Sequence, residues 1–262
     1  MSRRLLPMAV ALAALFVAPA LAHTEPPTSE AFGVIKAPSF AQAKAQAFAW
    51  LNAVKADADT LRRAEEVWKP AADKSLLERT AETLLLGDAD ARDLIAKLRQ
   101  RTGPAPAVVP ELLKDESRPA YYRANLGLYF AKQLTDRRAH EEALEVLKAT
   151  RPEQVIDPAA YYFFKAVCEN KLLKKQEAIA SIDRLLNSVA DVPERYAVVA
   201  VLMKYDMQNW KDDDLGDIAR RMEEIEGRLD NAKGGPKTQE KQDEVVKRLV
   251  AMIKKLEEEC GA

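Results

Sequence analysis

The sequence predicts an all-α protein in which helical hairpins follow one another, with a small helical bundle before them and an antiparallel helical hairpin after them. Glycine is scarce, with 9 residues among 262, whereas Ala, Leu, Glu, Lys and Arg dominate, which favours helices over sheets. Apolar residues recur at steps of three and four positions, the period of one helical face. The hydrophobic content of 48% is ample for a packed core.

The chain begins with the pattern of an export signal. Arg3 and Arg4 precede an uncharged stretch over residues 5–22 that is rich in Ala, Leu and Val and ends in small residues. We expect residues 1–22 to be a signal peptide cleaved after Ala22, and the mature protein to be periplasmic or secreted. An uncleaved membrane anchor is the alternative, since the apolar run just reaches the length of about 18 residues that a membrane-spanning helix needs. Its many alanines are weakly hydrophobic and favour cleavage, after which we expect no stable membrane insertion.

Two segments with different character follow the signal. Residues 23–38 carry several prolines and little periodicity, and they predict a flexible leader. Residues 39–102 predict an N-terminal bundle of four short amphipathic helices. The expected helix boundaries in this bundle lie at Ser39, Pro70, Gly87 and Asp88.

The proline-rich segment over residues 103–117 predicts a linker between this bundle and the rest of the chain. Its prolines remove backbone donors and fix extended dihedral angles. Residues 118–210 then predict longer helices separated by short turns, so neighbouring helices must pack antiparallel. The expected helices cover 118–134, 139–150, 158–172, 174–189 and 193–210.

A repeated pattern runs through two of these helices. The sequence Glu142-Ala143-Leu144 reappears as Glu177-Ala178-Ile179, at an offset of 35 residues. In addition, Ala166 and Ala178 are twelve residues apart. With this period and these small residues, residues 118–190 resemble the tetratricopeptide family of helical-hairpin repeats.

The resemblance is degenerate in several places. Gly127 matches a small residue of the first helix, but it precedes Ala143 by sixteen residues, one helical turn too many. Lys165 and Glu169 stand where the family prefers Leu and Tyr. The proline that usually follows the second helix is also displaced.

The resemblance implies a right-handed array with a concave groove, lined by the first helix of each hairpin, that binds a protein or peptide partner. The residues that it places in this groove are Tyr121, Ala124, Leu128 and Lys132 from one unit and Ala160, Phe163, Val167, Asn170 and Lys171 from the next. The alternative is that these residues belong to the core, because aromatic residues at consecutive helical positions must turn one member inward.

Residues 211–262 predict an antiparallel helical hairpin of the coiled-coil type. Gly234-Gly235-Pro236 ends one helix and begins the next. Each apolar seam covers about two heptads, so we expect the seams to pack on each other or on preceding helices. The alternative is a homodimer that forms through whatever part of these apolar seams stays exposed. The two seams are Ile218, Met222, Ile225 and Leu229, and Val245, Leu249, Met252 and Leu256.

The Gly-Gly-Pro-Lys-Thr-Gln stretch that begins at Gly234 is similar to one in a little-characterised group of exported bacterial proteins. That resemblance implies no established activity. The two cysteines do not form a disulfide framework. Cys168 lies in a strongly helical segment and is expected to be buried. Cys260 lies near the end of the chain, where it could cross-link two chains in an oxidising compartment.

Composition and motifs argue against several classes of function. With 40 basic and 41 acidic residues the formal charge is −1, which disfavours a nucleic-acid partner. His23 and His140 are the two histidines, and neither has a plausible relay. A nucleophile elbow, a zinc-binding histidine pair, a phosphate loop and a paired-cysteine motif are all missing. We therefore expect no catalytic residue, no metal and no cofactor.

The leading hypothesis is an exported, non-enzymatic adaptor or scaffold that holds envelope proteins through the groove of residues 118–210. One alternative is a structural oligomer assembled through the C-terminal hairpin. Another is a hydrolase with two scattered carboxylates, which would require acidic side chains in a deep pocket with raised pKa values.

Overall fold

The computed structural model describes residues 33–70, 74–100 and 103–261. The predicted signal peptide and the leader up to residue 32 lie outside the described residues. Within these ranges the chain is all-α, as predicted, with twelve α-helices and no sheet. None of the described helices is both long and apolar enough to cross a membrane.

The four short helices of the N-terminal bundle are confirmed. They are α1 (Phe40–Ala53), α2 (Ala58–Val67), α3 (Leu76–Gly87) and α4 (Ala89–Arg99). Ser39 caps α1 in a capping box with Gln42. Asp88 caps α4, since its carboxylate accepts a hydrogen bond from the backbone N–H of Ala91 at 3.1 Å. Two of the predicted boundaries, Ser39 and Asp88, therefore coincide with capping interactions, whereas α2 ends at Val67, before Pro70.

The proline-rich segment is not helical over residues 103–110, although the short helix α5 (Glu111–Lys114) follows within the expected linker. The helices on either side of the segment share one hydrophobic core, in which α3 and α4 pack against α6 (Ala120–Asp136). Trp50 of α1 stacks on Tyr122 of α6, with ring centroids 5.4 Å apart. The bundle is thus continuous in packing with the helices that follow.

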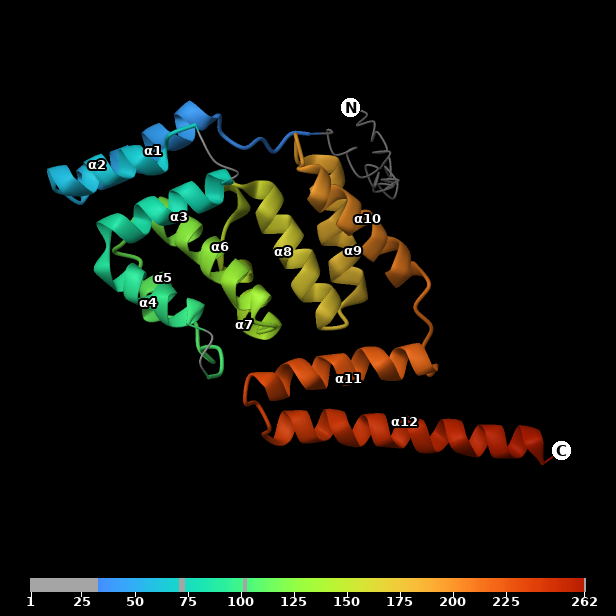
Figure 1. Ribbon diagram of the computed structural model, residues 1–262. Coiled ribbons are helices and arrows are strands. Elements are labelled where there is room, and N and C mark those ends of the chain that lie inside the picture. Colours follow the sequence, from blue (N-terminus) through green and yellow to red (C-terminus); the bar gives the residue numbers. More distant parts are fainter. Residues whose placement is uncertain (1–32, 71–73, 101–102, 262) are drawn as a thin grey trace, which may run out of the picture. The chain divides into compact units, whose positions relative to one another are not determined.

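Two packed helical hairpins form the centre of the chain (Figure 1). The first joins α6 to α7 (His140–Ala149). A 3₁₀ turn (Pro152–Gln154) leads to the second, which joins α8 (Pro158–Lys171) to α9 (Lys175–Asp183). A π-helical segment (Arg184–Ser188) extends α9, and α10 (Glu194–Gln208) follows and packs on α8 and α9.

The turns of the two hairpins repeat each other at the same 35-residue offset. Arg138 and Leu173 each adopt a left-handed backbone conformation, with φ of 59° and 57°. The next amide then reaches back five residues in both turns: Ala139 N–H donates to the carbonyl of Leu134 at 2.9 Å, and Lys174 N–H to that of Glu169 at 2.8 Å. The 35-residue repeat therefore includes the turns between the helices, although the residues of these turns differ in sequence.

This offset corrects the match of Gly127. Ala131 precedes Ala143 by twelve residues, as Ala166 precedes Ala178, and all four alanines have 0% exposure. Ala131, not Gly127, is hence the equivalent of Ala166, and no extra turn lies between Ala131 and Ala143. A Cβ atom on Gly127 would lie 3.4 Å from the hydroxyl of Thr150, an ordinary contact.

Part of the predicted leader is ordered. Gly33 N–H donates to the carbonyl of Asn187 and Ile35 N–H to that of Ser188, both at 2.8 Å, and Ala190 N–H donates back to Ile35 at 2.9 Å. The result is an isolated parallel bridge beside the end of the α9 extension. Side-chain periodicity gave no sign of it, because the contact uses backbone groups.

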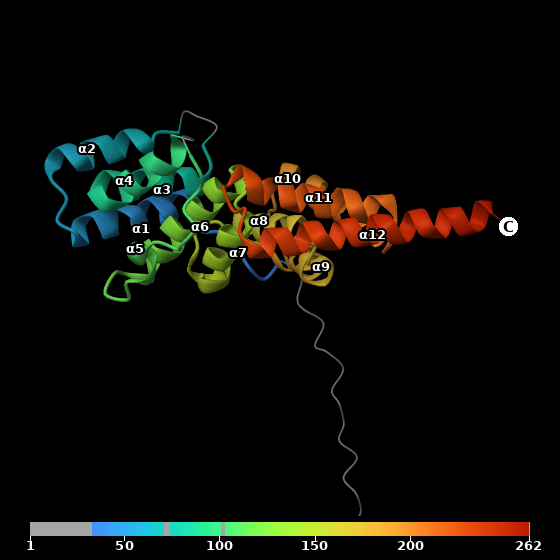
Figure 2. The same cartoon turned by 90° about the horizontal axis from the view of Figure 1, so that it is seen from below.

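The last two helices, α11 (Leu215–Asp230) and α12 (Pro236–Cys260), form the predicted antiparallel hairpin. Only part of the predicted seam is packed: Ile218, Ile225 and Val245 are buried, with Leu249 and Met252 against them. The seam positions Met222, Leu229 and Leu256 are exposed instead. In both views the end of α12 extends past α11 (Figures 1 and 2).

Candidate functional site

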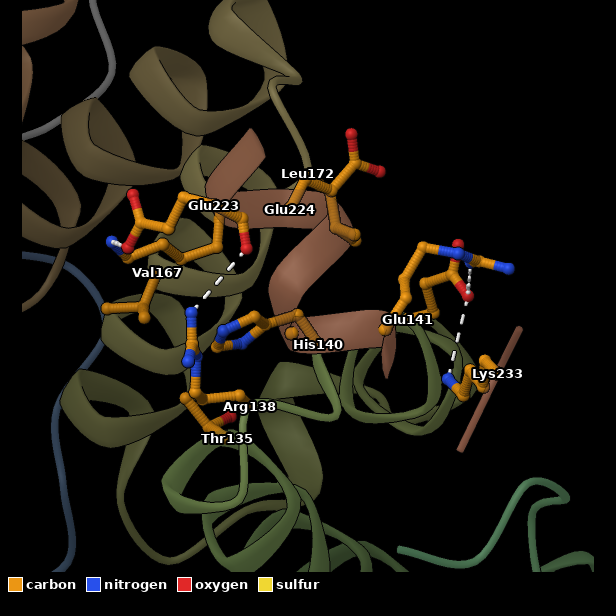
Figure 3. Close-up of a pocket in the computed structure, with 12 residues that line it drawn as sticks. Thr135, Arg138, His140, Glu141, Val167, Leu172, Glu223, Glu224 and Lys233 are labelled. Carbon is orange, nitrogen blue, oxygen red and sulfur yellow. Dashed lines mark hydrogen bonds and ion pairs between the residues drawn. The ribbon is translucent and has the colours of Figure 1, made fainter. Parts of the chain in front are cut away.

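A cleft of about 270 Å³ lies between the two central hairpins and α11 (Figure 3). The hairpins contribute Thr135, His140, Val167, Lys171 and Leu172 to its walls, and α11 contributes Glu223, Glu224, Gly227 and Arg228. Apolar side chains and charges of both signs are thus gathered in one depression.

Ion pairs hold α11 against the start of α7. Arg138 contacts Glu226 and Asp230 at 2.8 Å each. Arg228, itself buried, pairs with Glu141 and donates to the hydroxyl of Thr238 at 2.7 Å. These contacts fix the cleft wall through charges, whereas the seam of α11 with α12 is apolar.

Buried Asn231 adds a hydrogen-bonded junction at the end of α11. Its Nδ2 donates to the carbonyl of Arg137 at 3.1 Å and to that of Gly227 at 2.9 Å. Its Oδ1 accepts from the backbone N–H of Ala105 at 3.1 Å. One side chain therefore ties together the first hairpin, α11 and the proline-rich segment.

His140 stands at the N-terminus of α7 and faces the cleft (Figure 3). Its Nδ1 atom is buried and has no hydrogen-bond partner within the described residues. Burial, together with the nearby charges of Lys171 and Arg138, lowers its pKa to about 4. The imidazole is consequently neutral near pH 7 and can hydrogen-bond a ligand without carrying charge.

The carboxylates of the cleft are paired with cations. Burial raises the pKa of Glu141, but the hydrogen bond from Lys237 and the charge of Arg228 outweigh it, so this pKa is lowered overall. Glu223 pairs with Lys171. The lowered pKa keeps Glu141 ionised, so Glu141 is a poor proton donor at neutral pH.

Nucleophiles beside the cleft are also occupied. The hydroxyl of Thr135 donates to the carbonyl of Ala131 at 2.9 Å. Burial raises the pKa of Cys168 to about 12, so its thiol stays protonated. Across the ranges that the structure describes, no group of three or more His, Cys, Asp or Glu residues could hold a metal ion.

The groove positions predicted on α6 are largely enclosed by neighbouring helices. Ala124 and Leu128 are buried, Tyr121 is half-buried, and Lys132 forms an ion pair with Glu78 of α3 at 2.8 Å. Because α3 packs on this face of α6, a partner could not reach Leu128 in this structure. The family resemblance alone carried no information about that covering helix.

The positions predicted on α8 divide into two sets. Ala160 is buried, and Phe163 stacks on Tyr196 of α10 with centroids 4.3 Å apart. Val167 and Lys171 line the cleft, while Asn170 is half-buried on the same helix. The structure therefore brings together two of the nine predicted groove residues.

Sequence reasoning missed His140, Arg138 and Glu223 as site residues. In the sequence His140 is an isolated histidine, and the charged residues near it include Lys171, 31 positions later, and Glu223, 83 positions later. Charge pairs between distant helices leave no periodic signal in a sequence. Comparison of the chain with models of protein families, with curated proteins and with solved structures finds no match.

Proposed function

We propose that this chain is an exported adaptor without catalytic activity, which binds a protein or peptide partner in the cleft between α8 and α11. The observation that carries the proposal is the position of Val167 and Lys171. Both belong to the face that the repeat resemblance assigns to binding, and both line the cleft beside His140.

The proposal includes a right-handed, tetratricopeptide-like arrangement of the hairpins. It is supported by the shared 35-residue offset of the two turns and by the buried alanine pairs at a twelve-residue separation. In such arrays the face of the first helices is the usual recognition surface. Here α3 and α10 cover most of that face, so the part that remains open is at the C-terminal end of α8.

The size and lining of the cleft define the ligand that it suits. A cleft of about 270 Å³ lies just under the range of roughly 300–1,000 Å³ for small-molecule sites, so one or two side chains fit and a whole helix does not. Val167 and Leu172 offer apolar contact, and the neutral imidazole of His140 lines the same cleft. The partner is thus a peptide segment with an apolar side chain next to a polar group that hydrogen-bonds His140.

A hydrolase is disfavoured by the state of the acidic groups. The pKa of Glu141 is lowered rather than raised. Outside the cleft, burial raises the pKa of Asp157, but its carboxylate caps α8 by accepting from the backbone N–H of Ala160 at 2.8 Å. The role of Asp157 is therefore structural.

Site-specific photo-cross-linking in the native host tests the proposal. A photoreactive amino acid replaces Val167 in the cleft, and in a matched control it replaces exposed Val54 at the end of α1. We expect one envelope protein to be cross-linked from position 167 and not from position 54. Equal products from both positions, or none from 167, would overturn the assignment of the cleft.

A further inference from the structure

The helix α10 has the features of a first helix in a third hairpin. It follows Pro193, which lies 35 residues after Pro158, the residue at which α8 begins. Like the first helices before it, α10 packs on the preceding hairpin, formed by α8 and α9. The repeat therefore continues for one more helix than the two complete hairpins.

Among the residues that the structure describes, no second helix of this third unit stands in its expected place. Val201 lies at the repeat position of Ala131 and Ala166, which their second helices cover completely. Val201 itself is 52% exposed. After α10 the chain instead enters α11, which pairs with α12. The face of α10 that a second helix would cover is thus open.

This open face is a continuous apolar stripe. Val198, Val201, Leu202 and Tyr205 are separated by three, one and three positions, so they share one side of the helix, and each is between 51% and 68% exposed. Monomeric proteins rarely leave such contiguous apolar patches in water, and patches of this kind mark interaction sites. A covering partner is needed to remove the stripe from solvent.

The C-terminal hairpin carries a second open apolar face. On α11, Leu215, Met222 and Leu229 recur every seven residues and are exposed. On α12, the exposed residues Val246, Val250 and Ile253 follow one another at four and three positions. Both stripes lie beside the buried seam of the hairpin, and neither belongs to it.

The two stripes of the hairpin lie on the same side. On α11 the exposed Met222 follows the buried Ile218 by four residues, a rotation of about +40° around the helix axis. On α12 the exposed Val246 follows the buried Val245 by one residue, a rotation of about +100°. Rotations of the same sign on two facing antiparallel helices turn both stripes toward the same side. The hairpin hence presents a two-helix surface that lacks a third helix.

We propose that α10 of one copy of the chain packs on this face of the α11–α12 hairpin of a second copy, making an intermolecular three-helix contact. The chain itself supplies the two open surfaces, both built from aliphatic side chains at helical spacing. An antiparallel orientation of α10 to α12 of the second copy aligns their helix dipoles favourably. It also places Arg195, one turn before the α10 stripe, opposite Glu257, one turn after Ile253. A two-fold dimer forms this contact twice.

Light scattering on the mature chain and three single variants tests the proposal. Leu202→Glu places a charge in the α10 stripe, and Val250→Glu places one in the hairpin stripe. Val108→Glu is the control, because Val108 is exposed and lies on neither stripe. We expect a dimer for the wild type and the control. Each stripe variant should raise the dissociation constant by about 100-fold with unchanged helicity, as expected when a charge enters an apolar contact.

Mixing the two stripe variants distinguishes a contact between α10 and the hairpin from a contact between two α10 helices or between two hairpins. The Leu202→Glu chain keeps a normal hairpin and the Val250→Glu chain a normal α10, so the mixture regains one intact contact and forms heterodimers. Contact between two α10 helices would leave Val250→Glu dimeric, and contact between two hairpins would leave Leu202→Glu dimeric. Either result, or a wild-type monomer at high concentration, overturns the proposal and leaves the assignment of the cleft untouched.

Discussion

Lys165 and Glu169 form an ion pair one helical turn apart on α8, and Ser181 of α9 completes it. The ammonium of Lys165 lies 2.5 Å from the carboxylate of Glu169 and donates to the hydroxyl of Ser181 at 2.8 Å. That hydroxyl in turn donates to Glu169, which is only 1% exposed. These are two of the positions at which the chain departs from the tetratricopeptide pattern that it resembles, and they compensate each other inside the second hairpin.

Removal of one member of this pair should destabilise the protein strongly. Lys165→Met leaves the buried carboxylate of Glu169 without its cation, and we expect a loss of about 3 to 5 kcal/mol in the free energy of unfolding. The triple variant Lys165→Leu, Glu169→Leu, Ser181→Ala should recover most of this loss, since it replaces the whole network by apolar groups of similar size. Urea denaturation measures both values. Equal stability of the single and triple variants would contradict this explanation.

The corrected repeat register makes a prediction about α6. Ala131→Leu should cost about 1 to 3 kcal/mol of stability, because the residue is fully enclosed where α6 crosses α7. Gly127→Ala should instead stabilise by up to about 1 kcal/mol, since the added Cβ has ordinary contacts and alanine favours a helix. Thermal melting checks this order of stability, with Gly127→Ala above the wild type and Ala131→Leu below it. A large loss for Gly127→Ala would restore Gly127 as the closely packed position.

The stability of the fold should depend on pH through His140. Its pKa is lowered to about 4 in the folded protein from an ordinary 6.5, so the unfolded chain binds the proton first as the pH falls. The folded state therefore loses stability between about pH 6.5 and pH 4, by at most about 3 kcal/mol. His140→Leu should lack this component. The test is the difference in unfolding free energy between variant and wild type at pH 7 and pH 4.5, and a difference that does not change with pH would refute it.

Export makes a prediction about the mature N-terminus. If residues 1–22 are a cleaved signal, intact-mass measurement of the protein from its native host should give a chain that begins at His23. Replacement of Ala22 by a bulky residue should block cleavage, because the peptidase accepts small residues there. A mature chain that begins at Met1 would support the anchor alternative instead.

Local signals in the sequence were sufficient for the longer helices, but they missed the short helix α5 and the site. Ser39 and Asp88 marked helix starts because a capping side chain acts on amides three residues away. The cleft depends on pairs such as Arg228 with Glu141, 87 residues apart, which no helical period encodes. Similarly, Lys132 of α6 pairs with Glu78 of α3, a helix outside the repeats. Family resemblance placed Val167 and Lys171 on a binding face. It could not indicate which helices cover the other predicted groove residues.

The most direct test of the cleft exchanges the charges of Lys171 and Glu223, which form an ion pair across it. The double variant Lys171→Glu, Glu223→Lys keeps an ion pair between α8 and α11 but reverses its polarity toward a ligand, and its melting temperature serves as the control for folding. Titration calorimetry with the protein that cross-links to position 167 should show at least a roughly tenfold weaker affinity, about 1.4 kcal/mol. Unchanged affinity in a folded double variant would contradict the account.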